Sequence, residues 1–216
     1  MGSTERSARR SLELRHGRTL AFVLLLAPAA WLAYRTVSGD LGADPVETLS
    51  QETGRWTLRL LLVTLAITPA RRLLGWKRLI RYRRMAGLFA FAYGCLHLSC
   101  FVALDQFFDP AGIAHEIAER RWITIGMASW LLLVPLAATS TDAAVRRLGG
   151  KRWRRLHRLV YAAAAGGVLH YYLAVKADTR FPLLYAAVLA VLLAARLVPR
   201  WGNGRRAARA GAPGGS

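Results

Sequence analysis

Six apolar segments, each close to the length of a membrane-spanning helix, set the strongest constraint on how this chain folds. A helix needs about 20 apolar residues to cross the roughly 30 Å of hydrocarbon in a bilayer. We therefore predict an all-α, polytopic membrane bundle of six transmembrane helices. Arg59 lies inside the second segment, near enough to an end for its guanidinium to reach the membrane interface. The predicted spans cover about residues 19–36, 56–74, 85–104, 122–140, 156–175 and 181–198.

The charge and composition of the chain together indicate which kind of molecule it contacts. Lysine and arginine number 31 against 12 acidic residues, a formal net charge of +19 that by itself would suit a nucleic-acid-binding protein. A composition that is 54% hydrophobic, arranged in long apolar stretches, excludes a soluble nucleic-acid binder and a disordered polycation. We therefore expect contact with membrane lipid and no nucleic-acid partner.

Basic and acidic residues alternate between successive connections. The N-terminal tail, the second-to-third and fourth-to-fifth connections and the C-terminal end hold 24 of the 31 basic residues, and the other connections hold nine of the 12 acids. Because cytoplasmic loops are enriched in lysine and arginine, we expect both termini to be cytoplasmic. Residues 1–18 then form a basic cytoplasmic tail, residues 19–198 the transmembrane domain, and residues 199–216 a disordered basic tail.

Two histidines lie deep inside predicted spans, where ionisable residues are costly and usually functional. His97 follows Arg84 by 13 residues, and His170 follows His157 by 13 residues. At about 1.5 Å per residue, both imidazoles lie roughly 20 Å from the cytoplasmic ends of their helices. Two imidazoles at one depth on two helices are typical of axial ligation of a haem iron. Simple packing of both histidines inside the bundle is the alternative.

His157, at the cytoplasmic entrance of the fifth span, faces away from His170 on an ideal helix, because 13 residues rotate by about 220° beyond whole turns. The third span has Arg83 and Arg84 at this level, so the pattern does not support a second haem with two histidine ligands. Beside Arg154 and its basic neighbours, His157 suits a group such as a haem propionate, a flavin phosphate or a quinone oxygen. Contact with lipid headgroups is an equally compatible interpretation.

The sequence lacks the signatures of a soluble redox domain. It contains no Gly-x-Gly-x-x-Gly, no Walker loop and no Cys-x-x-Cys-His. We therefore expect neither a nicotinamide-binding domain nor covalently attached haem, and no catalytic residue. If the protein transfers electrons, its donor and acceptor are separate molecules.

Several strings of residues in a fixed order carry a family resemblance. They are residues 78–93 followed by Leu96-His97-Leu98, the string Thr139-Ser140-Thr141, residues 156–161, and His170-Tyr171. Together they resemble the MsrQ family, the haem-binding membrane subunits of a bacterial methionine sulfoxide reductase system, within the ferric-reductase-like transmembrane group. The resemblance covers roughly residues 55–198.

The resemblance implies a function that spacing does not show. Proteins of this family carry electrons through the bacterial inner membrane to MsrP, a periplasmic molybdopterin enzyme that reduces methionine sulfoxide in oxidised envelope proteins. It implies electrons from the quinone pool or a cytoplasmic flavin reductase, and haem b and FMN as cofactors, although no motif marks an FMN site. The residues it implies are the haem ligands His97 and His170, His157 as a further haem or cofactor residue, and Arg83, Arg84 and Arg154 on the cytoplasmic cofactor side.

Two other functions stay open on the sequence. A stand-alone transmembrane ferric or cupric reductase keeps the fold and changes the partner. A small non-redox membrane transporter would use the histidines as proton relays or packing groups.

Overall fold

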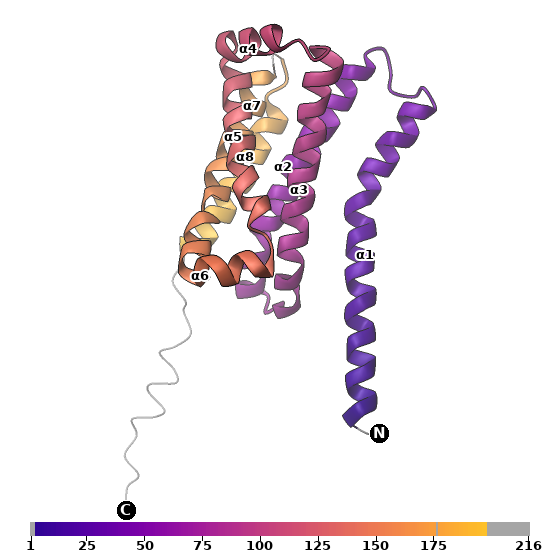
Figure 1. Cartoon of the computed structure of the whole chain (residues 1–216), viewed down its shortest axis with the longest axis vertical. Helices are drawn as coiled ribbons and strands as arrows, with labels where there is room; N and C mark the ends of the chain where they lie inside the picture. Colours follow the sequence, from indigo (N-terminus) through magenta and orange to yellow (C-terminus); the bar gives the residue numbers. More distant parts are fainter. Residues whose placement is uncertain (1–2, 176, 198–216) are drawn as a thin grey trace, which may run out of the picture.

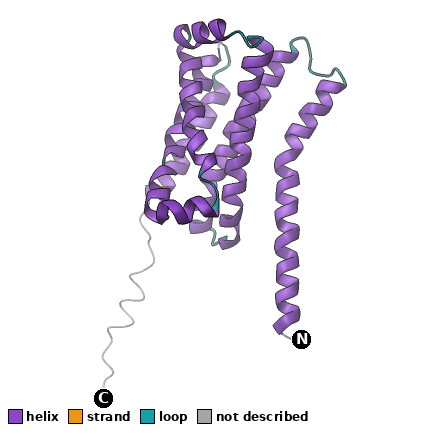
Figure 2. Cartoon of the chain, in the orientation of Figure 1, coloured by secondary structure: helices purple, strands orange, loops and turns teal. Residues whose placement is uncertain are grey.

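The computed structural model describes residues 3–175 and 177–197, and every regular element within them is a helix (Figure 2). The predicted all-α class is therefore confirmed. Most of the long helices pack into one bundle, and α1 lies along one side of it (Figure 1). The long helices are α1 (Ser3–Val37), α2 (Pro45–Leu73), α3 (Arg83–Ser99), α5 (Arg121–Ala138), α7 (Leu159–Ala174) and α8 (Arg180–Leu197).

Shorter elements close the two ends of the bundle. The 3-10 turn η1 (Lys77–Tyr82) joins α2 to α3, and the π-helical turn η2 (Cys100–Asp105) ends α3. Helix α4 (Pro110–Glu119) lies at one end, which we name the acidic end, because α4 and the acid-containing connections before α2 and α4 lie there (Figure 1). Helix α6 (Asp142–Leu156) lies at the other, the basic end, where α2 and α8 end and α3 begins.

Four of the described helices are long and apolar enough to cross a membrane, namely His16–Val37, Arg78–Asp105, Arg121–Ala138 and Arg180–Leu197. Helix α7 is apolar but shorter, and α2, which contains Arg55 and Arg59, is not among the four. Both nevertheless pack inside the same bundle, α2 against α3 and α7 against α5. The chain is thus a helical membrane protein, while six spans with both termini in the cytoplasm remain a prediction. The tail predicted over 199–216 lies outside the described residues.

Local sequence explains why α2 begins well before the predicted second span. The Asp44 carboxylate accepts a hydrogen bond from the Glu47 N–H at 2.9 Å and so caps the helix. Pro45 occupies the first turn, where a missing N–H costs nothing. The helix therefore begins at Pro45 rather than near residue 56, which brings Ser50 and Gly54 into the bundle.

A buried tyrosine of α3 attaches α1 to the bundle. The Tyr93 hydroxyl accepts a hydrogen bond from Ala29 N–H at 2.8 Å and donates one to the Leu25 carbonyl at 3.0 Å. It therefore occupies the place of the helical bond between those two groups, an insertion that bends a helix. Pro28, which has no N–H to donate, lies in the same turn. Because α1 otherwise exposes mainly apolar side chains, Tyr93 is a principal anchor between α1 and α3.

Replacement of this anchor should loosen α1. In Tyr93→Phe the ring remains and only the hydroxyl is lost, so we expect a destabilisation of about 1–2 kcal/mol and faster amide hydrogen exchange across residues 25–32. Mass-spectrometric hydrogen exchange in detergent measures this effect, with Tyr34→Phe as the control because Tyr34 is exposed on α1. Equal exchange in Tyr93→Phe and the wild type would contradict the anchoring role.

Candidate functional site

His97 on α3 and His170 on α7 lie next to each other near the acidic end. Their ring centroids are 5.9 Å apart and their planes are inclined by 74°. Each histidine lies within about one helical turn of the C-terminal end of its helix. The structure therefore brings together the two residues that the sequence spacing placed at one depth.

Backbone carbonyls determine which ring nitrogen of each histidine carries the proton. His97 Nδ1 lies 2.8 Å from the carbonyl oxygen of Ser50, and His170 Nδ1 lies 2.7 Å from that of Trp122. A carbonyl oxygen only accepts hydrogen bonds, so both Nδ1 atoms are the donors. Each Nε2 then keeps a lone pair and has no hydrogen-bond partner within residues 3–175 and 177–197. Metal-ligating histidines are commonly oriented in this way.

Two glycines on neighbouring helices make room for these imidazoles. A Cβ on Gly126 of α5 would lie 2.6 Å from His170 Nδ1, and one on Gly54 of α2 would lie 3.1 Å from His97 Nδ1. Glycine inside a helix costs about 1 kcal/mol relative to alanine, so an isolated helical glycine signals a close approach. Neither the two glycines nor the two carbonyl acceptors were predicted from the sequence, and the glycines were the available signal.

The separation of the two rings fits a metal atom held by both. Imidazole–metal bonds are about 2.0–2.1 Å long, and the ring centroids of His97 and His170 are 5.9 Å apart, close enough for one metal atom to bind both residues. Imidazole nitrogen is a donor that haem iron takes as an axial ligand. The donor chemistry and the spacing therefore both fit a haem iron at this position.

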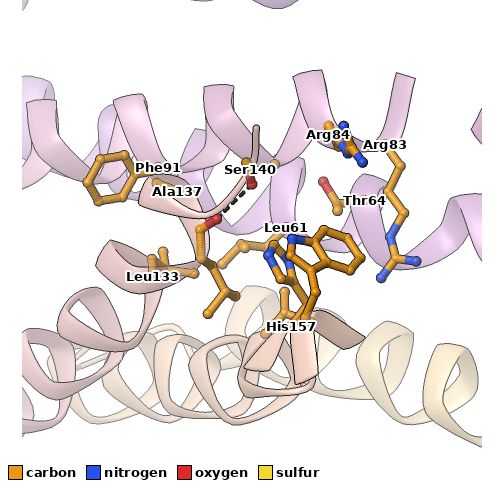
Figure 3. A pocket seen from close by; sticks show the side chains of 13 residues that line it. Leu61, Thr64, Arg83, Arg84, Phe91, Leu133, Ala137, Ser140 and His157 are labelled. Carbon is orange, nitrogen blue, oxygen red and sulfur yellow. Dashed lines mark hydrogen bonds between the residues drawn. The ribbon is translucent and has the colours of Figure 1, made fainter. Parts of the chain in front are cut away.

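His157 lies apart from this pair, at the basic end, and lines the pocket drawn in Figure 3. Arg83, Arg84 and Trp153 line it together with His157, whereas Arg154 is exposed and does not. The pocket measures about 70 Å³, which is room for a few water molecules. The structure thus groups His157 with Arg83 and Arg84, and separates it from the two facing histidines.

The Nε2 atom of His157 is hydrogen-bonded to Thr139. The Thr139 hydroxyl donates to the Pro135 carbonyl at 2.6 Å, so its oxygen accepts from His157 Nε2–H at 3.1 Å. Trp153 stacks on the His157 ring with centroids 3.9 Å apart and donates from Nε1 to the Thr139 carbonyl. His157 is therefore held with its proton on the nitrogen opposite to that of His97 and His170, and does not present a free Nε2.

Aromatic side chains lie between the pocket and the facing histidines. Phe91 lines the pocket and stacks on Trp130, with ring centroids 5.9 Å apart. Trp130 in turn lies against Gly94, whose Cβ would be 3.3 Å from the indole ring. Gly94 is one turn before His97 on α3. Packed side chains thus connect the basic-end pocket with the histidine pair.

An ion pair between Arg84 and Asp142 joins the pocket to α6. The Arg84 guanidinium holds the pKa of the Asp142 carboxyl below its usual 3.8, and Arg146 and Arg18 lower this pKa further. Because the folded pKa is depressed, the pair stabilises the fold above about pH 4, and this contribution is lost as the pH falls through the folded pKa. Both side chains are partly or fully exposed, so the effect on global stability is small.

The carboxyl chemical shift of Asp142, followed by NMR against pH, measures this depressed pKa. We expect a titration midpoint below 3.8 in the wild-type protein and a higher midpoint in Arg84→Gln. Arg147→Gln removes one exposed charge of α6 and serves as the control. If the midpoint is the same in Arg84→Gln and the wild type, Arg84 does not control the charge of Asp142.

Known proteins resemble the chain over most of its length. The model of the ferric reductase like transmembrane component matches residues 53–168. A relative from Rhodospirillum rubrum is 58% identical over 86% of this chain and 89% of its own length. The chain belongs to the MsrQ family. Another relative, from Caulobacter vibrioides, is 51% identical over 90% of both chains, and one from Xanthomonas axonopodis pv. citri is 45% identical over 99% of this chain and 97% of its own.

These relatives share one description, the haem-binding subunit MsrQ of protein-methionine-sulfoxide reductase. The family match includes His97 and His157 and ends two residues before His170. No solved structure matches the chain. Membership of the MsrQ family thus rests on sequence similarity. The geometry of the histidine pair supports haem binding separately from that similarity.

Proposed function

We propose that this chain is the haem-binding, electron-transfer subunit of a methionine sulfoxide reductase system in the bacterial inner membrane. The observation that carries the proposal is the pair of His97 and His170, with facing rings, Nδ1 atoms bonded to carbonyls and unpartnered Nε2 atoms. The description shared by its MsrQ relatives supports the same function.

His97 and His170 would hold haem b through their Nε2 atoms. A haem bound there would supply reversible one-electron transfer at its iron. The carbonyls of Ser50 and Trp122 orient the imidazoles and increase the basicity of Nε2, which tunes the potential of a bound metal. Gly54 and Gly126 leave the space that the two rings occupy, because a Cβ at either position would lie 3.1 Å or less from an imidazole nitrogen.

The position of the site supports a direction for the electrons. The histidine pair lies in the half of the bundle nearer the acidic end, which faces the periplasm in the predicted topology. His170 is about one turn from the end of α7, and η2 continues the helix of His97 to Asp105. An acceptor docked there, an MsrP-like periplasmic molybdoenzyme that repairs oxidised proteins, would be close to the haem. The donor, either the quinone pool or a cytoplasmic flavin reductase, would act from the basic end, where Arg83, Arg84 and His157 form the pocket. FMN remains a prediction for which the described residues suggest no site.

A pyridine haemochrome assay on the purified protein, followed by reconstitution in liposomes with an MsrP-like enzyme, tests this function. We expect haem b in the preparation and electron delivery to the enzyme when a quinol or reduced flavin is supplied. A haem-free preparation from haem-replete cells would favour the non-redox transporter. Rapid reduction of ferric or cupric chelates, without transfer to the enzyme, would favour the stand-alone reductase.

A further inference from the structure

An apolar groove runs between α7 and α8. It measures about 410 Å³, and its lining includes Leu169 and Tyr172 of α7 and Leu183 of α8, all of which are exposed on the surface of the bundle. In a membrane this surface faces lipid, so an apolar groove of this size has room for part of a hydrocarbon chain.

At the basic end, the groove leads to Arg196. Leu189 and Leu193 line it on α8, and Arg196 follows three residues later on the same helical stripe. Ala165 lines it on α7, and Tyr161 lies one turn nearer the basic end. Arg196 Nη1 donates a hydrogen bond to the Tyr161 hydroxyl, so the two stripes meet at this pair.

Arg196 lies near other arginines at the basic end. Its Nη2 donates to the Leu65 carbonyl at 2.5 Å, but its Nε is buried and finds no hydrogen-bond partner in the part of the chain that the structure describes. Arg72 Nη1 lies 3.4 Å from the Arg196 carbonyl, and Arg71 and Arg196 are near enough to Arg83 to repel its charge. We name Arg71, Arg72, Arg83 and Arg196 the arginine cluster.

Within the part of the chain that the structure describes, the arginine cluster has no acidic partner. Among the side chains that the structure describes, none of its members forms an ion pair with a carboxylate. Partly buried guanidinium groups without counter-charge are unfavourable. The cluster is therefore complementary to an anion that comes from outside the chain.

We propose that the groove and the arginine cluster form a binding site for one anionic phospholipid. An acyl chain lies in the groove between α7 and α8, and the headgroup phosphate contacts Arg196 at the basic end. Basic pockets between membrane helices bind anionic headgroups in this way. An isoprenoid quinone has a comparable tail, but its neutral head offers no compensation for the charge of the cluster.

Native mass spectrometry of the full chain in mild detergent, after delipidation, tests the proposal. We expect phosphatidylglycerol to bind at one site and more tightly than phosphatidylcholine, which carries no net charge. Arg196→Gln should weaken phosphatidylglycerol binding on the order of tenfold, because it removes a charge-assisted contact. Arg147→Gln, which removes an exposed charge of α6, should change it little.

A second pair of variants tests the groove independently of the arginines. Ala190→Trp fills the groove from an exposed position and should weaken phosphatidylglycerol binding, whereas Ala187→Trp, exposed on α8 outside the groove, should not. This pair decides the matter if Arg196→Gln does not fold. Equal binding of both lipids, equal effects of Arg196→Gln and Arg147→Gln, or equal effects of the two tryptophan variants would each overturn the proposal. Displacement of phosphatidylglycerol by a quinone, or by inorganic phosphate at equal concentration, would also overturn it.

Discussion

Replacing either His97 or His170 by alanine should abolish the low-spin haem spectrum of the purified protein. Each imidazole has its Nδ1 atom bonded to a backbone carbonyl, which leaves Nε2 as the atom that can bind a metal. Loss of a residue that merely orients a metal ligand lowers affinity about 10- to 100-fold, so loss of the ligand itself should lower haem content by at least about tenfold. The pyridine haemochrome assay measures the haem content, and reduced-minus-oxidised absorbance spectra measure the low-spin haem signal.

His115→Ala is the matched control for these two variants. His115 lies on α4 with an exposed side chain and pairs only with Glu119 of the same helix. We expect its haem content and spectrum to equal those of the wild type. Full haem retention in both His97→Ala and His170→Ala would show that the two residues are not the axial ligands.

Gly126→Ala should perturb the same site without removing a ligand. The new Cβ would lie 2.6 Å from His170 Nδ1, closer than real contacts allow, so the ring must move and its hydrogen bond to the Trp122 carbonyl must weaken. Because that bond orients the ligand, we expect haem affinity to fall by about tenfold and the reduction potential to shift. Haem titration and spectroelectrochemistry measure these two effects.

Two other glycines provide a graded comparison. A Cβ on Gly54 would lie 3.1 Å from His97 Nδ1, so Gly54→Ala should have a smaller effect than Gly126→Ala. A Cβ on Gly87 would meet only Thr64 at 3.8 Å, an ordinary contact, so Gly87→Ala should leave haem binding unchanged. If all three variants reduce haem binding equally while circular dichroism shows intact helices, steric contact with the ligands is not the cause.

Much of the fold was predictable because apolar length is a local property. The predicted sixth span begins at 181 and α8 begins at Arg180, and the fourth is predicted over 122–140 where α5 covers Arg121–Ala138. The second span was harder, because α2 extends beyond its apolar stretch to a cap at Asp44 that only local side-chain geometry reveals. The first predicted span is similarly the apolar part of a longer helix, which begins at Ser3.

The candidate site was predictable only in part. Depth along a helix follows from residue count, so the spacing of His97 and His170 predicted that they share a level. The rotation of each helix about its axis does not follow from residue count, and it determines that these rings meet while His157 lines a pocket apart from them. The partners of the Nδ1 atoms are Ser50 and Trp122, each almost 50 residues away in the chain.

The amino-acid sequence by itself determined the helical class, the apolar segments, the uneven distribution of basic residues and the level of the two histidines, because each depends on residue type and on distance along one helix. Tertiary structure alone decided which nitrogen of His97, His170 and His157 is free, and where glycine rather than alanine is needed. Those features depend on how close separate helices approach, and a carbonyl or a missing Cβ on one helix has no signature in the sequence of another.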